Sequence, residues 1–181
     1  MEASLRTVVE LVTGRKVEDL FVNANVLPVR GFEGVRTAEI PIHAVGPVPD
    51  LLKLNSALPF SDWNWLEGAV LKVAVCHGTA NAKRVLLDIK AGGAFSTYHF
   101  IEFMACPGGC LGGGGMPIPT SPEIRAARAR AIYAEDARTE VRKSHENPAV
   151  VRLYREFLTD GPCGHRSHEL LHTTYTPRGK Y

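Results

Sequence analysis

Residues 70–76 read Val-Leu-Lys-Val-Ala-Val-Cys, a nearly continuous apolar run. A run of this length predicts a strand that is buried on both faces, as in a parallel sheet. A helical pattern follows and stops at Gly92-Gly93, and a second strand is predicted at about 98–106. One strand–helix–strand unit predicts a parallel pair with a right-handed crossover. The sequence therefore predicts an α/β fold, with a small parallel sheet flanked by helices.

Further elements are predicted on both sides of this unit. Apolar spacing and a closing Gly14 indicate a helix at residues 2–13, and residues 35–42 have the pattern of a strand. Two more helices are predicted to begin at an N-cap residue followed by proline, one from Ser121-Pro122 to about Arg138 and one from Asn147-Pro148 onward. A last short helix is predicted at about 166–173.

Residues 43–68 are predicted to form a long loop or surface excursion. They contain three prolines and the closely spaced Trp63 and Trp65. Loops of this length inside compact domains are uncommon and often contact something. We therefore expect this segment to meet a partner chain.

Composition limits the class of protein. A chain of 181 residues with 45% hydrophobic and 22% charged residues fits one globular domain, here 1–181. The net charge of +2 is mixed along the chain, which gives no indication of nucleic-acid binding. No apolar run approaches the ~18 residues of a membrane span, and the N-terminus does not resemble a signal peptide. The sequence thus predicts a cytoplasmic protein, whose four cysteines suggest metal binding or catalysis before disulfides.

The most informative segment is residues 101–117, Ile-Glu-Phe-Met-Ala-Cys-Pro-Gly-Gly-Cys-Leu-Gly-Gly-Gly-Gly-Met-Pro. Strand alternation would place Glu102, Met104 and Cys106 on one face, with Cys106 at the strand's C-terminal end. Sites of open α/β sheets collect at that end. Cys110 follows after a glycine turn that could bring its sulfur beside the first.

Six of the eight residues from Gly108 to Gly115 are glycine. Glycine loses the most conformational entropy on folding, so this composition indicates backbone that must pass close to a bulky group. A phosphate-binding P-loop fits poorly, because no Gly-Lys-Ser/Thr follows. Two cysteines around a glycine turn instead favour thiolate ligation of iron–sulfur or zinc.

The number of thiolates sets a further limit. A [4Fe–4S] cluster takes four cysteine ligands, and Cys106 with Cys110 gives two. Cys76 ends a predicted strand and could approach the same edge, and Cys163 lies in a turn before the last helix. One site made by all four cysteines is an alternative, although its spacings match no common pattern. The interpretation we favour is that the other ligands come from another polypeptide.

Residues 102–117 resemble the third signature motif of the iron-only ([FeFe]) hydrogenases. The resemblance continues in the family's order through residues 2–14, 72–86, 142–148 and 168–175. It implies the C-terminal part of the catalytic domain of such an enzyme. The implied reaction is 2H⁺ + 2e⁻ ⇌ H₂, and the implied cofactor is the H-cluster, a [4Fe–4S] cubane joined to a diiron unit with carbon monoxide, cyanide and dithiolate ligands.

The resemblance also implies roles for individual residues. Cys106 matches a cubane ligand, Cys110 matches the cysteine shared between cubane and diiron unit, and Met104 matches the methionine packed against the diiron site. Glu102 would hydrogen-bond nearby backbone, although a satisfied buried carboxylate explains it equally well. The resemblance also implies that the backbone approaches the cofactor closely at four glycines: Gly108, Gly109, Gly113 and Gly114.

The family's first two cysteine motifs are absent from this sequence. We therefore expect a subunit or fragment that needs a second polypeptide carrying those motifs. An electron carrier such as ferredoxin or an NADH-linked subunit, and cluster-maturation proteins, are further expected partners.

Three alternatives remain open. Hydrogenase-like iron–sulfur assembly factors carry a similar loop, and a hydrogen-sensing relative would also share it. Residues 168–172, His-Glu-Leu-Leu-His, formally match the His-Glu-x-x-His motif of zinc hydrolases. That motif needs a third protein ligand. Packing or capping of a terminal helix explains these histidines more simply.

Overall fold

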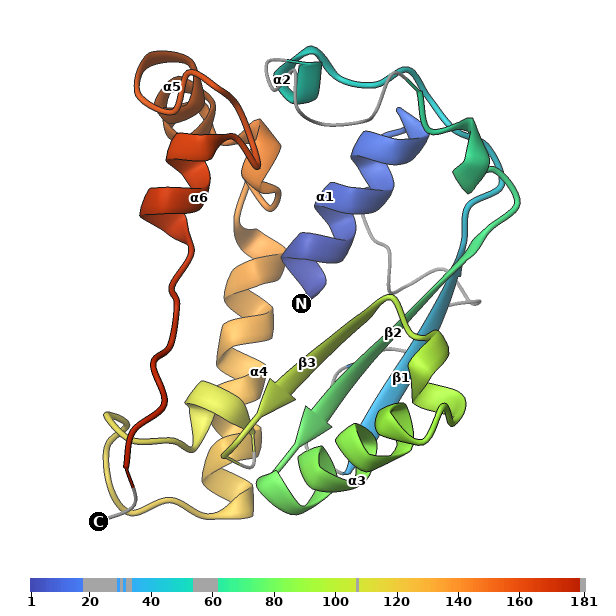
Figure 1. The fold of residues 1–181 in the computed structure, drawn as a ribbon. Coiled ribbons are helices and arrows are strands. Elements are labelled where there is room, and N and C mark those ends of the chain that lie inside the picture. Colours follow the sequence, from blue (N-terminus) through green and yellow to red (C-terminus); the bar gives the residue numbers. More distant parts are fainter. Residues whose placement is uncertain (18–28, 30, 32–33, 54–61, 107, 180–181) are drawn as a thin grey trace.

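The computed structural model describes residues 1–17, 29, 31, 34–53, 62–106 and 108–179. Its centre is a three-stranded sheet in the order β1 (Val35–Pro41), β2 (Val70–His77), β3 (Phe100–Met104). Helix α3 (Thr79–Lys90) connects β2 to β3 and lies along the sheet (Figure 1). The predicted strand–helix–strand unit is therefore confirmed.

The sheet is mixed rather than wholly parallel. β2 and β3 run parallel, with Val73 opposite Phe100 and His77 opposite Met104. β1 runs antiparallel to β2, with Val35 opposite Cys76. The apolar run of β2 indicated a strand that is buried on both faces. A central strand is buried in this way whether its neighbours run parallel or antiparallel to it.

The core lies between the sheet and helix α1 (Glu2–Thr13). Gly14 ends α1 in the left-handed region at φ 66°, as its position in the sequence predicts. Leu5, Val9 and Val12 of α1 are buried with residues from alternate positions of two strands, Ala38, Ile40, Val73 and Val75. Alternation of side chains directs the other face of β2 toward α3.

The segment at 43–68 packs on the chain's own core at both of its described ends. Trp63 is 6% exposed, and its Nε1 donates to the Gly46 carbonyl at 2.6 Å. The Gly46 amide donates to the carbonyl of Val12 at 2.7 Å, which joins the segment to α1. The segment includes helix α2 (Asp50–Lys53), and its residues 54–61 lie outside the described residues. It is therefore more than a surface excursion.

The C-terminal part is helical. It holds α4 (Pro122–Arg138), α5 (Pro148–Glu156) and α6 (His165–Leu171). The predicted caps are confirmed, since Ser121 accepts from the Ile124 amide and Asn147 from the Ala149 amide. Short 3₁₀ turns complete the fold at Asn64–Leu66, Ala94–Thr97, Gly109–Leu111 (η3) and Ser144–Glu146.

No helix within the described residues is both long enough and apolar enough to cross a bilayer.

Candidate functional site

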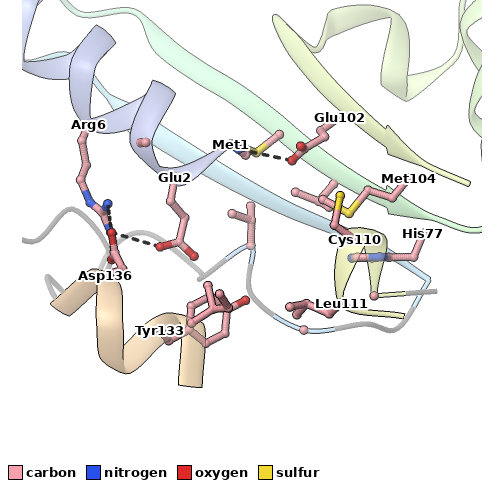
Figure 2. Close-up of a pocket in the computed structure, with 16 residues that line it drawn as sticks. Met1, Glu2, Arg6, His77, Glu102, Met104, Cys110, Leu111, Tyr133 and Asp136 are labelled. Carbon is pink, nitrogen blue, oxygen red and sulfur yellow. Dashed lines mark hydrogen bonds and ion pairs between the residues drawn. The ribbon is translucent and has the colours of Figure 1, made fainter. Parts of the chain in front are cut away.

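A pocket of about 340 Å³ opens where the carboxyl ends of β2 and β3 meet α1 and α4 (Figure 2). It is the site that the strand topology predicts, because ligand sites of open α/β sheets collect at this end of the strands. Its lining comes from both halves of the chain: Met1, Glu2, Ala3, Arg6, Val29, Gly31, Val75, His77, Glu102, Met104, Gly108, Cys110, Leu111, Ile132, Tyr133 and Asp136.

The strand register sets which side chains face this pocket. Glu102 lies opposite Val75 and Met104 lies opposite His77, and all four line the pocket. The predicted shared face of Glu102 and Met104 is therefore confirmed. β3 ends at Met104, so the alternation does not extend to Cys106, which is exposed in the bend after the strand.

The two cysteines of the loop are placed by a tight turn. The Gly109 amide donates to the Cys106 carbonyl at 2.9 Å, and turn η3 then carries Cys110. Both thiols are exposed, and Cys110 lines the pocket beside Met104 (Figure 2). A Cβ atom on Gly113 would lie 3.5 Å from Sγ of Cys106, so the second half of the glycine run passes against this thiol.

Met104 makes Gly109 necessary. Gly109 has φ +57°, and a Cβ atom at this position would lie 2.5 Å from Sδ of Met104. The methionine sulfur thus occupies the space that a side chain would need. Met104 and the glycine turn are fitted to each other, which fixes the loop relative to the end of β3.

Replacing Gly109 by alanine should therefore disturb the loop strongly. The left-handed backbone alone costs a non-glycine residue about 1–2 kcal/mol, and the clash with Met104 adds to that. Gly114 provides the control, because nothing lies within 4 Å of the space for its Cβ atom. We expect Gly109→Ala to lower the free energy of unfolding in urea by at least about 2 kcal/mol and Gly114→Ala to change it by less than half as much. Equal effects of the two variants would contradict the fit of Met104 against Gly109.

The two remaining cysteines are absent from the pocket lining. Cys76 is fully buried in β2, one residue out of phase with Val75 and His77, so it faces the opposite side of the sheet. Burial raises the pKa of its thiol, which opposes thiolate formation. Cys163 is exposed in the turn before α6. Of the four cysteines, Cys110 alone is in the pocket lining, and Cys106 lies four residues before it in the same loop.

An ion-pair network forms the wall between α1 and α4. Arg6 is 1% exposed, and its guanidinium donates to Asp136 at 2.9 and 3.0 Å and to Glu2 at 3.2 Å. Arg142 also donates to Asp136 at 2.7 Å. Burial would raise the pKa of Asp136, but the hydrogen bonds from Arg142 and Arg6 outweigh it and hold this pKa below its ordinary value.

His77 and Arg6 also line the pocket, although the sequence led us to interpret His77 as a structural residue and assigned no role to Arg6. His77 ends a buried strand at the same edge as the cysteine loop, and that position was an available signal. Burial lowers the pKa of its imidazole, more than the backbone of Gly31 and the charge of Glu102 raise it. His77 therefore contributes a neutral ring to the pocket at neutral pH. The sequence gave no indication that Arg6 lies in the pocket, because its partner on α4, Asp136, is 130 residues away.

The other candidate metal ligands form separate groups. The rings of His168 and His172 lie 4.3 Å apart on exposed positions, and within the described chain no third ligand joins them. Glu10, His145 and Glu146 do bring ligand atoms within 4.8 Å of one another. Lys143 lies among them, 2.7 Å from Glu10 and 2.9 Å from Glu146, so a lysine supplies the positive charge.

Solved structures with this fold are catalytic domains of [FeFe] hydrogenases. One from Chlamydomonas reinhardtii matches with a TM-score of 0.69 and 35% identity, over 97% of this chain and 43% of that one. The chain belongs to the family described as iron only hydrogenase large subunit, C-terminal domain, which residues 1–114 match. Residues 122–178 match a second family, the iron hydrogenase small subunit.

Proteins with similar sequences include hydrogenase subunits. The NADP-reducing hydrogenase subunit HndD of Solidesulfovibrio fructosivorans is 38% identical over 98% of this chain. The periplasmic [Fe] hydrogenase large subunit of Nitratidesulfovibrio vulgaris is 39% identical over 74% of it. The chain spans about a quarter of the length of these relatives, 25% in both cases.

Iron–sulfur assembly factors are also similar to this chain. A probable cytosolic Fe-S cluster assembly factor of Drosophila persimilis is 38% identical over 59% of the chain. The alternative that the loop sequence left open is thus represented among the relatives.

Proposed function

We propose that this chain is the C-terminal part of the H-cluster-binding domain of an [FeFe] hydrogenase, which catalyses 2H⁺ + 2e⁻ ⇌ H₂ once another polypeptide segment completes the site. The observation that carries the proposal is the pair of exposed thiols, Cys106 and Cys110, around a glycine turn at the carboxyl end of β3. Thiolates of this kind are the ligands that iron–sulfur clusters take.

The two cysteines of the loop account for half of the four thiolate ligands that a [4Fe–4S] cubane takes. Cys106 and Cys110 supply two thiolates, and Gly113 leaves space beside the Cys106 sulfur that a side chain would fill. Cys76 is buried on the other face of the sheet. Two further cubane ligands must therefore come from outside this chain, which agrees with its match to about a quarter of each relative.

Each residue of the site has a distinct role in this proposal. Cys106 would hold the cubane, and Cys110 would supply the thiolate shared by the cubane and the diiron unit. When bound, the H-cluster would supply the two-electron chemistry that interconverts protons and hydrogen. Met104, which lines the pocket together with Cys110, would pack its thioether beside the cluster. The backbone approaches the cluster through four glycines: Gly108, Gly109, Gly113 and Gly114.

Glu102 has a different place in the proposal. It lines the pocket, and its carboxylate lies 3.5 Å from the N-terminal amine of Met1. We assign it to holding nearby backbone at the edge of the pocket. This role is structural and requires no contact with the cofactor.

The surfaces of the chain support a partner that carries the other two cysteine motifs. Within the described part of the chain, β3 pairs on one side only, with β2. Phe100 and Phe103 on this strand are 48% and 41% exposed. Trp65 is 68% exposed, so this residue of segment 43–68 is available to a partner, whereas Trp63 is in the core. A ferredoxin or NADH-linked subunit would deliver electrons, and maturation proteins would install the cluster. The cytoplasmic location stays a prediction.

The test is anaerobic co-expression of this chain with the polypeptide that carries the remaining motifs and with the maturation proteins. Purification through a tag on this chain and infrared spectroscopy in the carbonyl and cyanide stretching region then report the diiron unit. Carbonyl and cyanide bands are the expected result. A stable complex that contains iron and sulfide without such bands would replace this proposal by the assembly-factor function.

The assembly factor is the second candidate because such proteins share 38% identity with part of this chain. The match of residues 122–178 to the hydrogenase small-subunit family favours the hydrogenase. Hydrogen sensing uses the same site, and turnover measurements on the loaded complex distinguish it from catalysis.

A further inference from the structure

One arginine connects α4 to the cysteine loop. Arg128 donates through one guanidinium nitrogen to the Leu111 carbonyl at 2.9 Å and through the other to the Pro117 carbonyl at 2.7 Å. Leu111 directly follows Cys110, and Pro117 lies two residues after Gly115, the last glycine of the run. A single side chain thus bridges both ends of residues 111–117.

The loop needs such an anchor. Its glycines have the greatest conformational freedom of any residue, and holding them in one conformation is unfavourable without compensating contacts. Backbone hydrogen bonds within the run are long, 3.3 Å from the Gly112 amide to Gly109 and 3.4 Å from the Met116 amide to Gly113. The bonds from Arg128 are shorter and come from a charged donor, which makes them the stronger kind.

The anchor also crosses the boundary between the two family matches. Leu111 lies in residues 1–114, which match the large-subunit domain, Pro117 lies between the two matches, and Arg128 lies in residues 122–178, which match the small subunit. The planar guanidinium suits two carbonyls at once, and the single ammonium of lysine does not. The position of the thiol of Cys110 is thereby tied to the α4 helix.

We propose that Arg128 is a positioning residue, which holds the glycine-rich loop and with it Cys110 in the geometry that receives the cluster. The role as an anchor follows from the contacts alone, and the consequence for the cluster rests on the proposed function. Through this residue the small-subunit segment sets the ligand geometry of the large-subunit segment.

Amide hydrogen exchange on the full chain without cofactor tests the anchor. Arg128→Gln should accelerate exchange at the loop amides of Gly109, Leu111, Gly112 and Met116 by at least about tenfold, because local opening no longer breaks two charge-assisted hydrogen bonds. Arg130→Gln is the matched control, since Arg130 lies on the same helix and is exposed. Unchanged exchange in Arg128→Gln, or equal acceleration in Arg130→Gln, would overturn the proposal.

Arg128→Lys guards against a general loss of folding. This variant keeps the charge and the helix propensity, so the melting temperature should stay near that of the wild type while the loop amides still exchange faster. Acceleration that is confined to the loop supports the anchor. Acceleration spread over α4 and β3 as well would show a structural effect and would count against it.

Infrared spectra of the loaded complex test the positioning role. Arg128→Gln should broaden or shift the carbonyl and cyanide bands, because a ligand held by neighbouring groups loses its fixed orientation when they are removed. Arg130→Gln should leave the bands unchanged. If the loop amides of Arg128→Gln exchange faster but its infrared bands are unaltered, Arg128 anchors the loop without positioning Cys110 for the cluster, and the positioning role is refuted. Absence of bands from the wild type would refute the proposed function, and the exchange result would still decide the anchor.

Discussion

Replacing Cys110 by alanine is expected to abolish the carbonyl and cyanide bands of the complex and all hydrogen turnover. In the proposed site, this thiolate is the connection between the cubane and the diiron unit, and a methyl group cannot ligate iron. The folded chain itself should be almost unaffected. Cys110 is exposed, so its truncation should change the free energy of unfolding by no more than about 0.5 kcal/mol.

Cys163→Ala is the matched control for this variant. Cys163 is also an exposed cysteine, but it lies in the turn before α6 and is absent from the pocket lining. The control should retain both the bands and the turnover. Full bands in Cys110→Ala, or their loss in Cys163→Ala, would show that the ligands have been assigned wrongly.

Replacing Arg6 by alanine is expected to cause a large loss of stability. Arg6 is 1% exposed and joins α1 to α4 through two hydrogen bonds to Asp136. Breaking a buried ion pair typically costs about 3–5 kcal/mol, and a value near the lower limit is expected because Arg142 still pairs with Asp136. Urea unfolding of the full chain measures this loss. A loss below about 1 kcal/mol would mean that the network does not hold α4 against α1.

Arg138→Ala supplies the comparison. Arg138 also forms an ion pair on α4, but it is 75% exposed and its partner Glu135 is 68% exposed. Exposed pairs contribute about 0–1 kcal/mol, so this variant should stay close to the wild type. The contrast between the two arginines isolates the effect of burial.

Acid should act on the same network. The pKa of Asp136 lies below its ordinary value of 3.8, so its ionised form stabilises the fold. This contribution is complete above the unfolded-state pKa and is lost as the pH falls through the folded-state pKa. The difference in unfolding free energy between wild type and Arg6→Ala should therefore begin to shrink below about pH 4 and shrink further as the pH falls through the lower folded-state pKa of Asp136.

The sequence predicted the local elements well, because their signals are local. Gly14 ends α1, Ser121 caps α4, and the apolar run at 70–76 forms β2, each as its pattern indicated. The direction of β1 was not predictable in this way, since a strand has the same side-chain pattern in parallel and antiparallel pairs. The segment at 43–68 was predicted to be a long loop or a surface excursion, and the packing of Trp63 in the core was not predicted. This burial depends on residues of α1, which the local sequence does not specify.

The candidate site likewise has features that the sequence predicted and features that only the tertiary structure shows. Residues 101–117 by themselves determined that two cysteines, a methionine and a glycine run lie together at a strand end, because they are neighbours in the chain. Only the tertiary structure decided that Cys76 faces the opposite side of the sheet, that Arg6 meets Asp136 and that Arg128 holds the loop. These facts depend on register and on contacts between distant segments. Such contacts form only when the core has packed, and no local pattern of residues specifies them.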